Sequence, residues 1–174
     1  MNFIDLTWVA IAALATADAV TGFLHWVEDK HPEWVLQILG EWSVKAIIVP
    51  NMIHHDDPFA MTKDSYWSRV CHSTLFAIPI LAAGILLESW FLILFAIFAS
   101  QANQIHYWAH VVRPPLIVRW LQYARIFQSR RHHSVHHKAP FDVRFCVMTP
   151  WLNPIIDYLT KGWRSRRHQQ TTGE

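Results

Sequence analysis

The chain has 174 residues, a length that suits one domain, and we expect residues 1–174 to form a single unit. Hydrophobic residues make up 52% of it, with ten Trp and ten Phe, above the usual globular share of about 45–50%. The formal net charge of +2 says little about partners, and we expect none that is a nucleic acid. Two cysteines, Cys71 and Cys146, exclude a disulfide framework and are expected to be reduced, buried thiols. No cleavable signal peptide is expected, because no Lys or Arg precedes Lys30.

The first apolar segment, residues 3–24, is long enough to cross a bilayer. As a helix that rises about 1.5 Å per residue it spans roughly 33 Å, against a hydrocarbon core of about 30 Å. Asp18 lies deep inside this segment. An acid within a membrane span is costly, and by default it indicates a functional site.

Two later segments are amphipathic and predict helices that lie on a membrane surface. The segment 33–53 places Glu41 and Lys45 one helical turn apart, and it is interrupted by glycine and proline, so we expect it to be interfacial rather than spanning. The segment 115–129 has the same character, with apolar residues on one side and Arg and Gln on the other.

The hydrophobic block from residue 73 to residue 110 is too long for one span, because a single helix would measure roughly 57 Å. Glu88 and Trp90 interrupt it and predict a tight turn between two antiparallel spans, 73–87 and 90–110. The expected fold is therefore all-α and integral to a membrane. It has about three transmembrane helices, interfacial amphipathic helices and a His-rich cytoplasmic cap.

The distribution of charge supports this topology. With three spans, the N-terminus and the Glu88 turn fall on one side of the membrane, and all 15 Lys and Arg fall on the other. The positive-inside rule makes that second side cytoplasmic. We therefore expect a multi-pass protein of a bacterial inner membrane, or an equivalent one, with its histidines at the cytoplasmic face.

Twelve histidines are the outlier of the composition, and most of them fall into four clusters. The clusters are ADAVTGFLHWVED with Asp18, His25 and Asp29; HHDDP with His54, His55 and Asp57; NQIHYWAH with Asn103, His106 and His110; and RRHHSVHH with Arg130, Arg131, His132, His133, His136 and His137. Helical spacing places Asp18, His25 and Asp29 on one stripe and points His106 and His110 the same way. His31, His72 and His168 lie outside the clusters and are expected to be structural or surface residues.

Metal binding explains the clusters better than burial alone. An unpartnered buried imidazole costs on the order of 1–3 kcal/mol, and coordination removes that cost. So many nitrogens exceed the four ligands of one structural zinc and suit two ions, which could be Fe, Zn or Cu. Two zincs stay possible from chemistry alone. A histidine site at a lipid interface, with no obvious hydrolytic nucleophile, fits oxygen chemistry on C–H bonds better.

These four motifs, extended through KAPFDVRFCVMTPWLNP, resemble the Kua-type lipid desaturase family over roughly residues 17–158. The family includes animal and bacterial plasmanylethanolamine desaturases and the plant enzyme that puts a trans double bond into a phosphatidylglycerol acyl chain. The family's essential histidines match His25, His54, His55, His106, His110, His132, His133, His136 and His137. Its polar positions match Asp18, Asp29, Asp57, Asn103 and Asn153.

The resemblance implies a di-iron centre, with O2 as co-substrate, that removes two hydrogens from a lipid chain; zinc is possible in purified protein. The nine matched histidines would be metal ligands, and Asp29 a ligand or a partner of one. Asp18 would accept a hydrogen bond from His25, and Asn103 could hold a metal-bound water. Electrons would come from a cytochrome b5-like or ferredoxin-like partner.

Histidines near helix ends place the site close to the headgroups, so we expect the double bond near the glycerol end of a membrane phospholipid. Conversion of plasmanylethanolamine to plasmenylethanolamine is the leading prediction. Arg130 and Arg131 would bind the headgroup phosphate or anchor the protein to anionic lipid. A di-iron lipid hydroxylase, a di-zinc hydrolase and a non-enzymatic membrane scaffold with a zinc-stabilised cap stay open, as do the lipid, the redox partner and the oligomeric state.

Overall fold

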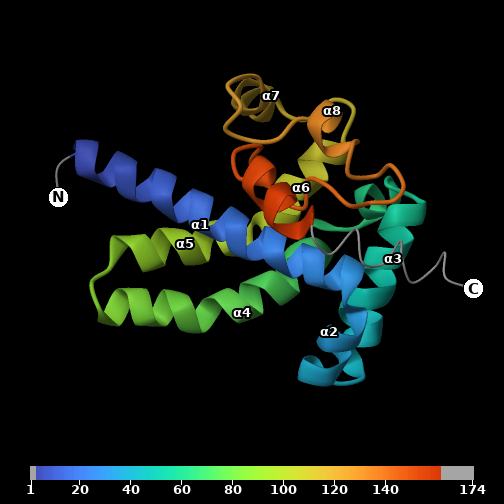
Figure 1. The fold of residues 1–174 in the computed structure, drawn as a ribbon. Coiled ribbons are helices and arrows are strands. Elements are labelled where there is room, and N and C mark those ends of the chain that lie inside the picture. The colour runs from blue at the N-terminus through green and yellow to red at the C-terminus, as the bar shows by residue number, and fades with distance from the viewer. Residues whose placement is uncertain (1–2, 162–174) are drawn as a thin grey trace, which may run out of the picture.

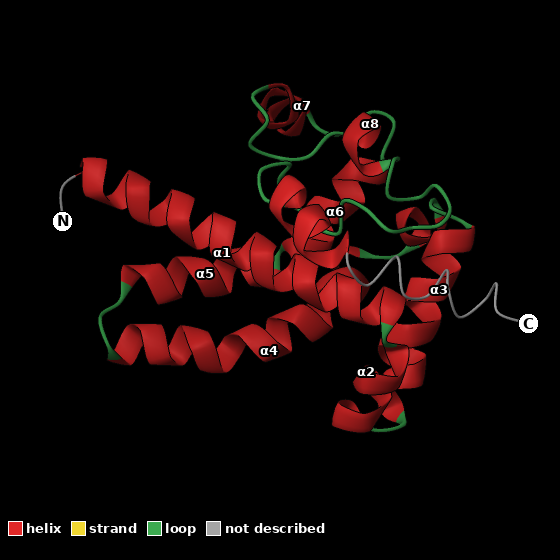
Figure 2. Ribbon diagram, viewed as in Figure 1, coloured by secondary structure: helices red, strands yellow, loops and turns green. Residues whose placement is uncertain are grey.

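The computed structural model describes residues 3–161, and every regular element within that range is a helix (Figure 2). The elements are α1 (Phe3–Lys30), α2 (Pro32–Leu39), the π-helix η1 (Val44–Ile48), α3 (Val49–Asp56), the 3₁₀-helix η2 (Ala60–Lys63), α4 (Tyr66–Leu86), α5 (Trp90–Ser100), α6 (Ala102–His110), α7 (Leu116–Tyr123) and α8 (Arg130–His133). A further helix begins at residue 153 and continues to the end of the described range. The predicted all-α class is confirmed for this part of the chain.

Helices α1, α4 and α5 run alongside one another, and the other helices gather at the end away from the α4–α5 turn (Figure 1). By length and composition, α1 and α4 are the two helices able to cross a membrane among the described residues. Their apolar side chains face outward: Phe3 is 85% exposed, Trp8 66% and Leu86 83%. An apolar surface of this extent is unusual for a soluble monomer and indicates that lipid or protein covers it.

The α4–α5 turn has the tight form that the sequence predicts. The Ser89 amide donates to the Gly84 carbonyl at 2.8 Å, and Glu88 adopts a positive φ of 50°. A Cβ on Gly84 would lie 2.9 Å from the backbone nitrogen of Ile93. Only glycine lets the two helices approach so closely at this point.

The predicted span over 90–110 is not one helix. It breaks at Gln101, whose φ of −99° and ψ of 4° are not helical, so α5 is short and α6 takes its own direction. Two side chains of α4 form hydrogen bonds with the residues at this break. The Tyr66 hydroxyl donates to Gln101 Oε1 at 2.9 Å, and the Ser73 hydroxyl donates to the Ser100 carbonyl at 2.9 Å. The break aims α6, with His106 and His110, into the interior.

The two predicted interfacial helices are shorter than expected. The segment 33–53 is divided at Gly40, whose φ of +78° reverses the chain between α2 and η1. This reversal returns α3 to the end of α1, where the two helices are in contact. Within 115–129, α7 covers only Leu116–Tyr123. The two long helices, by contrast, are longer than predicted. Helix α1 continues beyond residue 24 to Lys30, and α4 begins at Tyr66 rather than at residue 73.

Candidate metal centre

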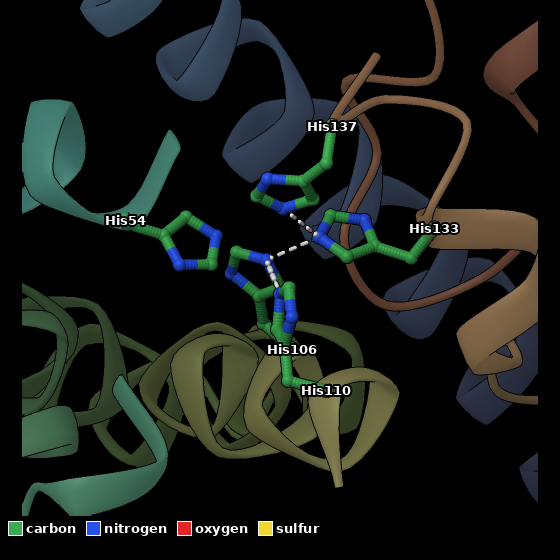
Figure 3. Close-up of side chains that lie close together, drawn as sticks. All are labelled: His54, His106, His110, His133 and His137. Atoms are coloured by element: carbon green, nitrogen blue, oxygen red, sulfur yellow. Dashed lines mark hydrogen bonds between the residues drawn. The ribbon is translucent and has the colours of Figure 1, made fainter. Parts of the chain in front are cut away.

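Five histidines from three helices and the turn after α8 converge on one point (Figure 3). One ring nitrogen from each lies within 4.8 Å of those of the others: His54, His106, His110, His133 and His137. We call these residues the five-histidine group. The Nε2 atom of His106 lies 2.7 Å from that of His133 and 3.2 Å from that of His110. The Nε2 atoms of His133 and His137 are 3.0 Å apart.

A second cluster, which we call the mixed group, contains three histidines and one carboxylate. His25 and Asp29 are one turn apart on α1, His55 comes from α3 and His136 follows α8, and their ligand atoms lie within 4.8 Å of one another. His25 Nε2 is 3.6 Å from Asp29 Oδ1, and His136 Nε2 is 3.4 Å from Asp29 Oδ2.

The two groups are neighbours. The ring of His25 lies 5.7 Å from that of His106, and the ring of His54 lies 5.8 Å from that of His55, between centroids. His133 and His136, one from each group, are 5.6 Å apart. The arrangement therefore suits two ions bound side by side rather than two unrelated sites.

The donor atoms fit metal ions. A metal–imidazole bond of about 2.1 Å puts nitrogens at right angles about 3.0 Å apart, which matches the separations within the five-histidine group. In the mixed group, His25 Nε2, His136 Nε2 and Asp29 Oδ2 are buried without a hydrogen-bond partner. Such atoms are costly unless something binds them, and a cation binds all of them at once.

Backbone carbonyls fix the tautomers of two candidate ligands. His25 Nδ1 lies 3.1 Å from the Phe145 carbonyl oxygen, and His136 Nδ1 lies 2.8 Å from that of Val143. A carbonyl only accepts, so each Nδ1 carries the hydrogen, and each Nε2 keeps its lone pair for the interior.

Burial keeps four candidate ligands neutral: His54, His133, His136 and His137. It lowers the pKa of His54, His133 and His136 well below the usual value near 6.5, and it lowers the pKa of His137 to about 4. Neighbouring histidines add to the effect, because a charged ring would repel them. At neutral pH these rings are therefore ready to bind a cation, since only the neutral form offers a lone pair.

Asp18 does not bind His25, so the predicted hydrogen bond between them is wrong. Its carboxylate, fully buried, accepts from the Met148 amide at 2.9 Å, the Thr149 amide at 3.0 Å and the Thr149 hydroxyl at 2.6 Å. Asp18 thus holds the segment that carries the Phe145 carbonyl, and that carbonyl occupies the place on His25 that the sequence assigned to the acid.

His132 lies outside both groups. Its Nε2 accepts from the Asn153 amide at 3.1 Å, and burial, followed by the charge of Arg144, lowers its pKa to about 4. The family resemblance matched His132 to a metal ligand, but α8 ends at His133 and turns follow, so His132 does not share the direction of His133, His136 and His137. Asn153 Oδ1 also accepts from the Cys146 amide at 2.9 Å, so His132 and Asn153 fix the backbone beside the site.

Two more predicted residues lie away from both groups. Asn103 is exposed, and its amide donates to the Arg69 carbonyl at 3.1 Å, so the expected contact with a metal-bound water is not supported. Asp57 has a side chain 47% exposed and pairs with Lys63 at 3.1 Å. The Lys63 ammonium holds the pKa of Asp57 below its usual value.

Among the described residues, the others singled out in the sequence also lie outside the two groups. Arg130 and Arg131 open α8 and are exposed, with the Arg130 guanidinium 5.2 Å from the Phe59 ring centroid; their lipid role stays a prediction. His31 is buried and stacks on Trp34, the ring of His72 lies 5.9 Å from that of Trp42, and His168 lies outside the described residues. Both cysteines are free, with Cys146 buried and Cys71 partly so.

The sequence reasoning missed Asn51, whose amide donates to Asp29 Oδ1 at 2.8 Å. Its signal was present, because Asn51 precedes His55 by one helical turn and so shares its face of α3. The carbonyls of Val143 and Phe145 carried no such signal, since any residue supplies a carbonyl.

Comparison with known proteins adds the family. Residues 14–166 match the lipid desaturase domain. The chain is 33% identical over 164 residues to plasmanylethanolamine desaturase 1 of Mus musculus, covering 86% of this chain and 59% of that protein. It is 29% identical over 160 residues to a plasmanylethanolamine desaturase of Myxococcus xanthus, covering 84% and 56%. It is 27% identical over 163 residues to the chloroplastic fatty acid desaturase 4-like 2 of Arabidopsis thaliana, covering 89% and 56%.

The chain thus spans a little over half the length of these curated relatives. No solved structure matches it. The match to the family covers most of the chain and includes every histidine of both groups. The resemblance seen in the sequence motifs is confirmed, and the chain belongs to the lipid desaturase domain family.

Proposed function

We propose that the chain is an O2-dependent di-iron lipid desaturase. The observation that carries the proposal is the meeting of two adjacent ligand groups, eight histidines and Asp29, whose mixed half leaves buried nitrogen and oxygen atoms unpartnered. This number of ligands exceeds one tetrahedral zinc and suits two ions, and imidazole is a good ligand for iron. An iron pair supplies the activation of dioxygen that C–H chemistry requires.

The protein would sit in a membrane as one unit over residues 1–174. Helices α1 and α4 would span, and α5 with α6 would form a third, broken pass that is tolerated because its break faces protein. Helix α7 exposes Leu116, Ile117 and Trp120 and would lie at the interface. The concentration of Lys and Arg on the site's side favours a cytoplasmic orientation, in a bacterial inner membrane or its equivalent.

The reaction must balance with an outside reductant. Two neighbouring carbons of the lipid each lose one hydrogen, and dioxygen takes these with two electrons and two protons to give two waters. A cytochrome b5-like or ferredoxin-like protein would deliver the electrons, and the exposed Arg131 and Lys138 beside the site would attract an acidic donor. Within the chain, burial of His133 and His136, 1% and 0% exposed, keeps bulk water away from the ligands.

The depth of the site indicates which bond reacts. His25 and Asp29 lie near the end of α1, about 33–39 Å along the helix from Phe3, and therefore close to the headgroup level. The reacting bond would lie near the glycerol end of the chain, as it does in a vinyl ether. Together with the names of the Mus musculus and Myxococcus xanthus relatives, this favours plasmanylethanolamine as substrate and plasmenylethanolamine as product. Arg130 and Arg131 would bind the headgroup phosphate.

Lipid profiling by mass spectrometry tests the proposal. The chain is expressed in cells that lack plasmalogens but contain alkyl-ether phospholipids, with His133→Ala as the inactive control. We expect a product two mass units lighter, acid-labile as a vinyl ether is, and absent from the control. A product sixteen units heavier would identify a hydroxylase instead, and a mid-chain double bond would contradict the depth argument.

A further inference from the structure

The two oxygens of Asp29 have different surroundings. Oδ1 accepts from the Asn51 amide at 2.8 Å and lies 2.9 Å from His55 Nε2. Oδ2 is buried, has no hydrogen-bond partner and lies 3.4 Å from His136 Nε2. Both oxygens therefore face candidate metal ligands, and Oδ1 is in addition tied to Asn51, a side chain outside the two groups.

Asn51 is suited to hold the first oxygen. It lies on α3 one turn before His55, so both side chains approach Asp29 from the same face. Its amide carries N–H donors at every pH and brings no charge that would compete with Asp29 for an ion. Asn51 and Asp29 both line an open pocket of about 320 Å³, where water would otherwise reach Oδ1.

We propose that Asn51 is a positioning residue that holds the Asp29 carboxylate in the orientation in which it binds the ion of the mixed group. This inference rests on the proposed di-iron function. The amide ties Oδ1 to α3 and so fixes the rotation of the carboxylate, while Oδ2 stays directed at His136 without a hydrogen-bond partner. The same helix that supplies His54 and His55 thereby sets the orientation of the one carboxylate in the centre.

The consequence is selective. The five-histidine group contains no carboxylate, and the Asn51 amide donates to Asp29 of the mixed group, so the ion of the five-histidine group does not depend on this hydrogen bond. Loss of a hydrogen bond to a metal ligand typically costs 10–100-fold in metal affinity. Removing the Asn51 amide should lower the affinity for the ion of the mixed group by about this factor and leave the affinity for the other ion unchanged.

Competition with a chelator tests the inference. Wild-type protein and Asn51→Leu, which is nearly isosteric but lacks the amide, are filled with Fe²⁺ without oxygen, and the bound iron is measured against rising chelator. We expect the wild type to keep two irons over a range where Asn51→Leu keeps one. Asn51→Ala repeats the measurement with a smaller side chain, in case the leucine does not fit. Thermal unfolding of each metal-free variant establishes that it is folded.

Asn103→Leu is the matched control, because it removes a comparable amide hydrogen bond outside both groups and should retain both irons. If folded Asn51→Leu or Asn51→Ala holds both irons as tightly as the wild type, or loses both together, the positioning role is wrong. If the wild type itself binds fewer than two ions, the di-iron proposal fails instead.

Discussion

Gly22→Ala perturbs a point where α1 packs directly against Cys146, in the segment whose Phe145 carbonyl orients His25. A Cβ at position 22 would lie 2.9 Å from the Cys146 sulfur, 3.0 Å from its Cα and 3.1 Å from its amide nitrogen. Two of these atoms belong to the backbone, so no rotation of a side chain can relieve the contact. The 145–149 segment must move away from α1 by a few tenths of an ångström.

Overpacking of this kind costs about 1–3 kcal/mol, which for a chain of this size lowers Tm by about 2–12 °C. The displacement also lengthens the contact of Phe145 with His25 and the bonds of Asp18 to Met148 and Thr149. We therefore expect lower thermal stability in detergent together with reduced iron retention by the mixed group. Thermal unfolding and metal analysis of the same preparation measure both effects.

A second substitution separates the sulfur from the backbone. Cys146→Ala removes the sulfur but leaves the two backbone atoms, so Gly22→Ala combined with Cys146→Ala should recover less than half of the lost stability. Full recovery would show that only the thiol is in the way. A Gly22→Ala protein with the stability and iron content of the wild type would refute the close-packing account altogether.

Three further outcomes follow from the same contacts. Asp18→Asn turns a donor toward the amides of the 148–149 segment and should destabilise the fold by about 1–3 kcal/mol, as measured by thermal unfolding. His132→Ala should retain both irons whereas His133→Ala should not, and equal loss in metal analysis would return His132 to the ligand set. Metal-free protein should lose stability as pH falls from about 6.5 to 4, because His132 and His137 take up protons in the unfolded chain but stay neutral in the fold, where burial lowers their pKa to about 4. A Tm that does not change with pH over this range would contradict the burial of these two rings.

The local pattern of the sequence predicts the helices and the convergence of most histidines, because helical spacing fixes direction within one element. His106 and His110 face the same way for this reason, and His25 and Asp29 do too. Helical spacing does not extend to His132, since HHSVHH does not continue as a helix, and its predicted place among the ligands is wrong. Spacing predicts a shared face only where the backbone stays regular.

Contacts between distant segments account for the other differences. The break at Gln101 depends on Tyr66 and Ser73 of another helix, and nothing within 90–110 indicates it. The role of Asp18 depends on amides of a segment 130 residues away, although its burial in an apolar helix correctly marked it as unusual. Family resemblance identified Asn153 as a matched position, but only the fold shows that it links His132 to Cys146.

The count and identity of bound metal test the central claim most directly. Protein purified without oxygen and reconstituted with Fe²⁺ should hold two irons per chain, and substitution of Asp29 should reduce that number toward one. A Mössbauer spectrum of the wild-type protein should show two distinct environments, one formed by nitrogens alone and one that includes a carboxylate oxygen. One tightly bound zinc per chain, with no uptake of iron, would contradict the account.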